Sequence, residues 1–195
     1  MLATPLKKPT PTPLSQEEDA ELMLRAQVDP AGPAFQVLYE RHRREVLGYL
    51  AALVRDRDLA EDTLQDVFFS VYEHRARYDS ARPFRPWLYR IARNAGLSAI
   101  TARRDARLES GHELETDSRD EPPRETARRE RIEQTQVALA ALPPETRALL
   151  LQRHSLGMKL TSLAESWGCT ERTIRNRLQA ACSELASVLS TGSEA

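Results

Sequence analysis

Apolar residues recur every three or four positions along most of this chain, and alternating patterns are nearly absent. A spacing of three and four puts side chains on one face of an α-helix, whereas a half-buried strand needs strict alternation. The run from about residue 34 to 54 shows the helical spacing most clearly, and its apolar positions are Phe35, Leu38, Tyr39, Val46, Tyr49, Leu50 and Leu53. Since no alternating Val-, Ile- or Thr-rich run is bounded by turns, the sequence predicts an all-α fold.

Three further helices are predicted in the N-terminal half. The first begins with Ser15 as its N-cap and carries acidic residues in its first turn. The second spans about residues 59–76, and its inward stripe is Leu64, Val67, Phe68 and Val71. The third spans about residues 84–104, and one of its faces carries Trp87, Leu88, Ile91, Ala92 and Ala95.

Composition divides the chain into two small helical domains. Residues 1–14 hold four prolines without periodicity, which predicts a disordered tail. The segment 84–107 has six Arg against one Asp, whereas 108–128 has seven acidic residues against three Arg. The acidic, Pro-containing stretch has almost no apolar anchor, which indicates a flexible linker. We therefore expect domains at 15–106 and 131–190, joined by an acidic linker at 107–130.

The residue inventory argues against an enzyme. Four histidines (His42, His74, His112, His154) are scattered, and no motif pairs them with a carboxylate or Cys. Cys169 and Cys182 have no metal-ligand spacing, and reduced thiols fit the cytoplasm. No stretch has the roughly 18 apolar residues that a membrane span needs. We expect no catalytic residues, no metal, no cofactor and no small-molecule substrate.

The stretch GMKLTSLAESWGCTERTIRNRL, residues 157–178, has the pattern of a helix-turn-helix. Gly168 suits a left-handed turn because it lacks a Cβ, and Thr170 suits the N-cap of the second helix. Leu160, Leu163, Ile174 and Leu178 would pack inside the hairpin. The residues left pointing outward are Arg172, Thr173, Arg175, Asn176 and Arg177. Arg and Asn can contact base edges or phosphates, although a hairpin with merely solvated arginines remains an alternative.

Aromatic and basic residues are interleaved in RPFRPWLYRIARNAGLSAITARRDAR, which starts at residue 82. Trp87 and Tyr89 stand among arginines, with Asn94 beside the basic face. Aromatic rings stack on unpaired bases while arginines follow the backbone, so the pattern indicates single-strand capture. The alternative is that Trp87 belongs to the core and the arginines only solubilise the helix.

Taken together, these motifs resemble the sigma-70 family of bacterial RNA polymerase sigma factors, specifically its two-domain extracytoplasmic-function group. The N-terminal motifs are AFQVLYERHRREVLGYL, DLAEDTLQDVFFSVYE and FRPWLYRIARN. The C-terminal motifs are LAALPPETRALLLQRH and SLAESWGCTERTIRNRL. The resemblance covers roughly residues 16–106 and 132–190. It implies a region 2-like and a region 4-like domain, and a protein that directs polymerase to promoters and helps to melt them.

The resemblance also implies a role for each motif. AEDTLQDVF matches the segment that docks on the clamp coiled coil of the polymerase largest subunit, and the implied interface is Asp62, Gln65, Asp66 and Phe68, although a core position for Phe68 remains an alternative. The loop and helix after it match the reader of the −10 element, for which the candidates are Tyr78, Trp87, Arg90, Arg93 and Asn94. The outward residues of the hairpin match the reader of the −35 element. Core polymerase, promoter DNA and an anti-sigma factor are the implied partners.

The sequence departs from the family pattern at a few positions, which leaves the promoter sequence open. Ser98 stands where the family usually has an acidic residue, and Lys159 replaces a Ser-like cap before the hairpin, so that the cap is either weaker or shifts to Thr161. Two other functions remain open. A sigma-like decoy would sequester an anti-sigma factor without supporting transcription. An ordinary helix-turn-helix regulator would need a ligand or dimerisation domain.

Overall fold

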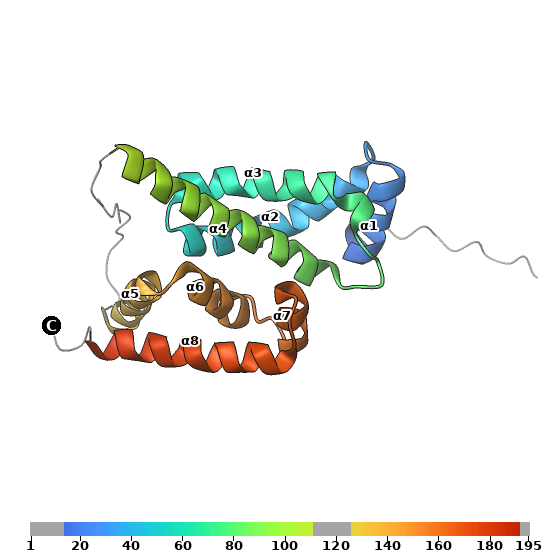
Figure 1. Ribbon diagram of the computed structural model, residues 1–195. Helices are drawn as coiled ribbons and strands as arrows, with labels where there is room; N and C mark the ends of the chain where they lie inside the picture. The colour runs from blue at the N-terminus through green and yellow to red at the C-terminus, as the bar shows by residue number, and fades with distance from the viewer. Residues whose placement is uncertain (1–13, 111–125, 192–195) are drawn as a thin grey trace, which may run out of the picture.

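The computed structural model describes residues 14–110 and 126–191, and side chains over 14–108 and 134–190. Figure 1 shows two layers of helices, with α1–α4 in one layer and α5–α8 in the other. The first layer contains η1 (Leu14–Gln16), α1 (Asp19–Val28), α2 (Pro33–Val54), α3 (Arg57–Glu73), η2 (Arg75–Arg77) and α4 (Phe84–Ser110). The second contains α5 (Thr126–Ala141), α6 (Pro144–Leu150), η3 (Leu151–Ser155), α7 (Leu160–Trp167) and α8 (Glu171–Thr191). Within the described ranges every regular element is helical, which confirms the all-α prediction.

Several predicted boundaries are corrected. Ser15 lies in the 3-10 turn η1 and does not cap α1, whose N-cap Glu18 makes no side-chain cap bond. Residues 107–110 and 126–130, expected in the linker, are helical because α4 continues to Ser110 and α5 begins at Thr126. Leu14, expected in the tail at 1–14, lies in η1, while the rest of that tail, 1–13, and the middle of the predicted linker, 111–125, lie outside the described residues.

The core of the first layer forms where α2, α3 and α4 meet. Leu50, Leu53, Val67 and Leu88 have no solvent exposure there, and each such buried side chain stabilises the fold by about 1.5–3 kcal/mol. Gly96 allows α4 to approach α2 closely, since a Cβ at this position would stand 2.8 Å from a methyl carbon of Leu53. This close approach fixes α4, the helix that carries the interleaved aromatic and basic residues.

A carboxylate ties α1 to α2. Asp19 accepts hydrogen bonds from Arg41 Nη1 at 2.5 Å and from His42 Nε2 at 2.9 Å. Arg41 also donates to the backbone oxygens of Ser15 and Glu17. Burial alone would raise the pKa of Asp19, but the hydrogen bonds and positive charges of His42 and Arg41 outweigh it and hold that pKa below its ordinary value of 3.8.

The lowered pKa of Asp19 predicts an acid-sensitive contact. A carboxylate whose pKa is lower in the folded chain stabilises the fold above its unfolded pKa, and loses that contribution as the pH falls through the folded value. At neutral pH we expect Asp19→Asn to cost about 1–2 kcal/mol of unfolding free energy. Urea unfolding should show this gap closing as the pH falls below about 4. A gap of constant size down to about pH 3 would contradict the assignment.

The two layers share one core. The largest cluster of buried apolar residues continues from the first layer into the second, where it includes Leu149, Leu151, Met158, Leu163 and Ile174. A smaller cluster around Leu142, Leu150 and Ala181 lies between α5, α6 and α8. The two predicted domains therefore pack directly against each other in this structure, which the prediction of a tether did not anticipate.

Arg147 ties the layers together from within. Its side chain is only 7% exposed, and its guanidinium donates four hydrogen bonds to backbone oxygens. One acceptor is Leu53 at the end of α2, at 2.7 Å, and the others are Leu139, Ala140 and Leu142 at the end of α5. Arg147 therefore supplies donors to carbonyls at or just beyond the ends of two helices, of which the Leu139 oxygen also accepts from the Leu142 N–H at 3.3 Å.

Candidate nucleic-acid interface

The hairpin α7–α8 has the predicted helix-turn-helix geometry. Gly168 ends α7 in the left-handed conformation, with φ of 61°, and Thr170 Oγ1 accepts from the Thr173 N–H at 3.2 Å. Leu163 and Ile174 are fully buried in the angle between the helices. The predictions for Gly168, Thr170 and the inner face are confirmed. Of the two alternatives for the first cap, the weaker cap is confirmed, because Lys159 is the N-cap of α7 and makes no side-chain cap bond, and the shift to Thr161 is wrong, because α7 already begins at Leu160.

The outer face of α8 carries the basic residues in solvent. Arg172, Arg175, Asn176 and Arg177 are exposed. Thr173 is half-buried, and its hydroxyl lies 2.9 Å from that of Thr170, so its side chain also helps to hold the cap. Four polar side chains within two helical turns give a surface that can contact base edges and phosphates in a major groove.

A cluster of three aromatic rings precedes and opens α4. The ring of Trp87 lies 5.2 Å from that of Tyr78 and 5.9 Å from that of Phe84. Tyr78 is only 5% exposed, and its hydroxyl donates to the backbone oxygen of Arg82 at 2.6 Å. Burial raises the pKa of Tyr78 to about 12. The prediction of Tyr78 as a DNA contact is therefore corrected. Its ring is buried and packs against the half-buried ring of Trp87.

The remaining candidates on α4 divide between two faces. Arg90 and Asn94 follow Trp87 by three and seven residues, so they share its face, and both are exposed. Arg93 is half-buried and turns toward α7, where it donates to the backbone oxygen of Ser166 at 3.2 Å. Tyr89, predicted among the stacking aromatics, is fully buried and packs edge-on against Tyr49.

Arg93 also contacts the hairpin through an aromatic face. Its guanidinium carbon lies 4.2 Å from the centroid of the Trp167 ring, within the range of a cation–π interaction. Arg177 of α8 approaches the same ring at 5.8 Å. Burial lowers the pKa of Arg93, and the positive charges of Arg90 and Arg177 act in the same direction.

The exposed face of α3 carries Asp62, Gln65 and Asp66, as predicted for an interface. Phe68 does not lie there, because its side chain is 4% exposed and its ring packs edge-on against Tyr39 at 4.8 Å. The aromatic on the exposed face is Phe69, at 66% exposure. Sequence analysis missed Phe69, although the stripe that placed Phe68 inward already left the next residue outside. Phe68 is corrected from an interface residue to a core residue.

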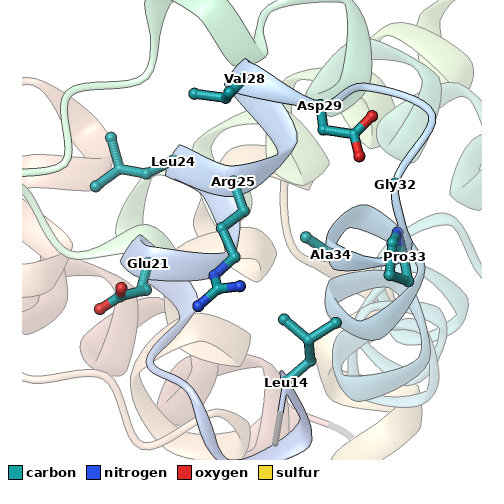
Figure 2. Close-up of a pocket in the computed structure, with 9 residues that line it drawn as sticks. All are labelled: Leu14, Glu21, Leu24, Arg25, Val28, Asp29, Gly32, Pro33 and Ala34. Atoms are coloured by element: carbon teal, nitrogen blue, oxygen red, sulfur yellow. The ribbon is translucent and has the colours of Figure 1, made fainter. Parts of the chain in front are cut away.

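A separate hollow of about 380 Å³ lies between α1 and the start of α2. Figure 2 shows Leu14, Leu24 and Ala34 around it, with the Arg25 side chain reaching between the two helices. Arg25, the basic side chain of this hollow, is ion-paired with Glu17 at 2.8 Å. The rest of the lining of this hollow is aliphatic or acidic, which does not suit nucleic acid.

Among the helices that the structure describes, none is long and apolar enough to cross a membrane. In the same residues, no group of three or more His, Cys, Asp or Glu side chains is placed to hold a metal ion. Both cysteines are free thiols.

Comparison with known protein families gives one match in each of the two layers. The family model described as Sigma-70 region 2 matches residues 38–106, and the one described as Sigma-70, region 4 matches residues 132–185. These ranges contain α3 with its acidic face, the aromatic cluster, nearly all of α4 and the hairpin α7–α8.

Relatives and solved structures agree with this match. The ECF RNA polymerase sigma factor SigM of Mycobacterium tuberculosis is 33% identical over 89% of this chain and 86% of its own length. RNA polymerase sigma factor CarQ of Myxococcus xanthus is 46% identical, over 39% of this chain and 44% of CarQ. The sigma factor RpoE, solved with the anti-sigma factor NepR from Bartonella quintana, has the same fold with a TM-score of 0.66, at 20% identity over 82% of this chain and 98% of that one.

Proposed function

This chain belongs to the extracytoplasmic-function group of the sigma-70 family of RNA polymerase sigma factors, and from that premise we propose which of its residues perform each step of initiation. A sigma factor binds core RNA polymerase and promoter DNA and directs transcription to specific start sites, without catalysis of its own. The observation that carries the assignment is the pair of surfaces described above: Trp87, Arg90 and Asn94 on one face of α4, and four exposed polar residues on α8.

The hairpin is assigned to the −35 element. A helix whose N-terminal turns carry exposed Arg172, Arg175, Asn176 and Arg177 can enter the major groove of duplex DNA. A bidentate contact from Arg to guanine or from Asn to adenine is worth about 1–3 kcal/mol of discrimination. Thr173 contributes chiefly by holding the N-terminus of α8.

The face of α4 is assigned to the −10 element. Promoter melting removes a base from the stack at a cost of a few kcal/mol, and stacking on an aromatic ring returns about 1–3 kcal/mol. Trp87 offers such a ring because Tyr78 and Phe84 hold it in place. Arg90 and Asn94 can then hold the backbone or a base edge, while Arg93 joins them when it is released from Trp167.

The exposed face of α3 is assigned to core polymerase. Asp62, Gln65 and Asp66 form its polar part, and Phe69 supplies the apolar anchor that Phe68 was expected to supply. An exposed aromatic ring surrounded by polar groups is typical of a contact that forms and dissociates. We further infer that the protein works in the cytoplasm, where core polymerase and promoter DNA are found.

We also propose an anti-sigma partner. The sigma factor RpoE, which has the same fold, was solved in complex with an anti-sigma factor, and we extend that partnership to this chain. A decoy that only sequesters such a partner is less consistent with the chain, because the aromatic and basic residues of α4 and α8 would then have no use.

Reconstitution with core polymerase tests the proposed function. The full chain should bind bacterial core RNA polymerase and form open complexes at a subset of sequences in a promoter library. Permanganate footprinting would locate the melted bases, and the selected start sites would define the promoter. Core binding without selective initiation would favour the decoy. No binding to core from any bacterial source would overturn the proposal.

Two adjacent phenylalanines provide a matched pair for the core-binding face. Phe69→Ala should weaken core binding by about tenfold, because loss of an exposed interface anchor costs about 1–2 kcal/mol, with little change in unfolding free energy. Phe68→Ala should instead cost about 3–5 kcal/mol of stability by leaving a cavity against Tyr39. Thermal unfolding and polymerase titration together separate the two effects. Equal core affinity for wild type and Phe69→Ala would remove Phe69 from the interface.

A further inference from the structure

The contact between α4 and α7 occupies residues that the proposed function needs elsewhere. The Trp167 ring has the Arg93 guanidinium at 4.2 Å and the Arg177 guanidinium at 5.8 Å. Arg93 is among the residues proposed for the −10 element, and Arg177 belongs to the helix proposed for the −35 element. A single indole therefore brings together one DNA-reading arginine from each half of the chain.

Gln152 connects this contact to the core of the first layer. It lies in the π-helical turn η3 and is fully buried, with its amide nitrogen 3.3 Å from Tyr49 Oη and 3.1 Å from the Tyr89 backbone oxygen. Its amide oxygen accepts from the indole N–H of Trp167 at 2.8 Å. The π turn matters because isolated π turns are uncommon and occur frequently at functional sites.

The composition of this contact is typical of an interface that can separate. Apolar side chains from both layers surround it, but its centre is made of Gln, Arg, Tyr and Ser. Within the described part of the chain, the buried Ser166 Oγ and Arg85 Nε have no hydrogen-bond partner. Surfaces between domains that move are more polar than permanent cores, and unsatisfied buried groups reduce the stability of the closed form.

We propose that Gln152, Ser166 and Trp167 form an autoinhibitory latch, which holds the hairpin against α4, keeps Arg93 from DNA, and opens before both halves engage a promoter. The contact itself is independent of the proposed function, but the role given to its opening rests on that function. A binding-competent state that is only a minor fraction of the population lowers the apparent affinity by that fraction. Weakening the latch therefore strengthens association with core polymerase and promoter.

The test uses the full chain and the variant Gln152→Ala, with Trp167→Phe as a second variant that loses the indole N–H but keeps an aromatic ring. Arg153→Ala is the matched control, since Arg153 lies in the same π turn and donates only to the Met158 backbone oxygen, at 2.8 Å. Small-angle X-ray scattering reports the separation of the halves, titration with core polymerase reports affinity, and circular dichroism verifies that each variant is folded.

We expect the wild type and Arg153→Ala to be compact, and both latch variants to have a larger radius of gyration and about tenfold higher core affinity. Latch variants that are folded, compact and unchanged in core affinity would overturn the latch, as would an already expanded wild type. If the latch variants expand but no form of the chain binds core, the proposed function fails while the latch contact stands.

Discussion

Replacing Arg147 with alanine is expected to lower the free energy of unfolding by about 3–5 kcal/mol, a large part of the stability of a domain this size. The substitution removes four hydrogen bonds to the backbone oxygens of Leu53, Leu139, Ala140 and Leu142. These carbonyls sit at or just beyond helix ends, where few other donors are available, although the Leu139 oxygen also accepts from the Leu142 N–H at 3.3 Å. The change also leaves a cavity between α2 and α6.

Urea unfolding of the full chain measures this cost, and two further variants isolate its cause. Arg147→Lys keeps the charge but not the planar fork, so it should recover only a minor part of the loss. Arg153→Ala removes a single hydrogen bond and should cost about 1 kcal/mol. A loss below about 1 kcal/mol in Arg147→Ala would show that water satisfies these carbonyls as well as the guanidinium does.

Promoter opening should fall by about 10- to 100-fold in Trp87→Ala, while binding to core polymerase is retained. The range follows from about 1–3 kcal/mol of stacking per captured base. Because Trp87 packs on Tyr78 and Phe84, the alanine variant also loses some stability, and the comparison must be made at equal folded fraction.

Trp87→Phe is the matched control for that experiment. Phenylalanine keeps a ring on the same support, so most of the opening activity should remain. Opening is measured by permanganate reactivity on a promoter selected from the library, and core binding by a separate titration. Undiminished opening in folded Trp87→Ala would assign base capture to another residue of α4.

Local patterns made the helices and the hairpin predictable. Helical spacing located α2, α3 and α4, and the turn chemistry of Gly168 and Thr170 located the break between α7 and α8, because both depend on residues near in sequence. The outward residues of α8 followed from the same spacing. The apolar stripe on α3 also separates Phe68, which faces inward, from Phe69, which faces outward, whereas the resemblance to the family places Phe68 at the interface.

What could not be predicted depends on residues far apart in the chain. Tyr89 is a polar aromatic suited to DNA contact, yet it is buried and packs against Tyr49 of another helix. Arg147 and Gln152 lie in the motif LAALPPETRALLLQRH as ordinary polar residues, yet their acceptors include groups 94 and 63 positions away. Sequence spacing within one helix carries no information on such partners.

The packing of the two halves has a consequence for proteolysis. Because the two halves belong to one chain, each experiences the other at an effective concentration of about millimolar. A contact too weak to hold two separate proteins together therefore still forms within the chain. A cut between α4 and α5 would turn closure into a bimolecular event that dilution reverses. Cleavage there would release the hairpin from α4. It would also remove the covalent connection between the two halves, which must engage a promoter together.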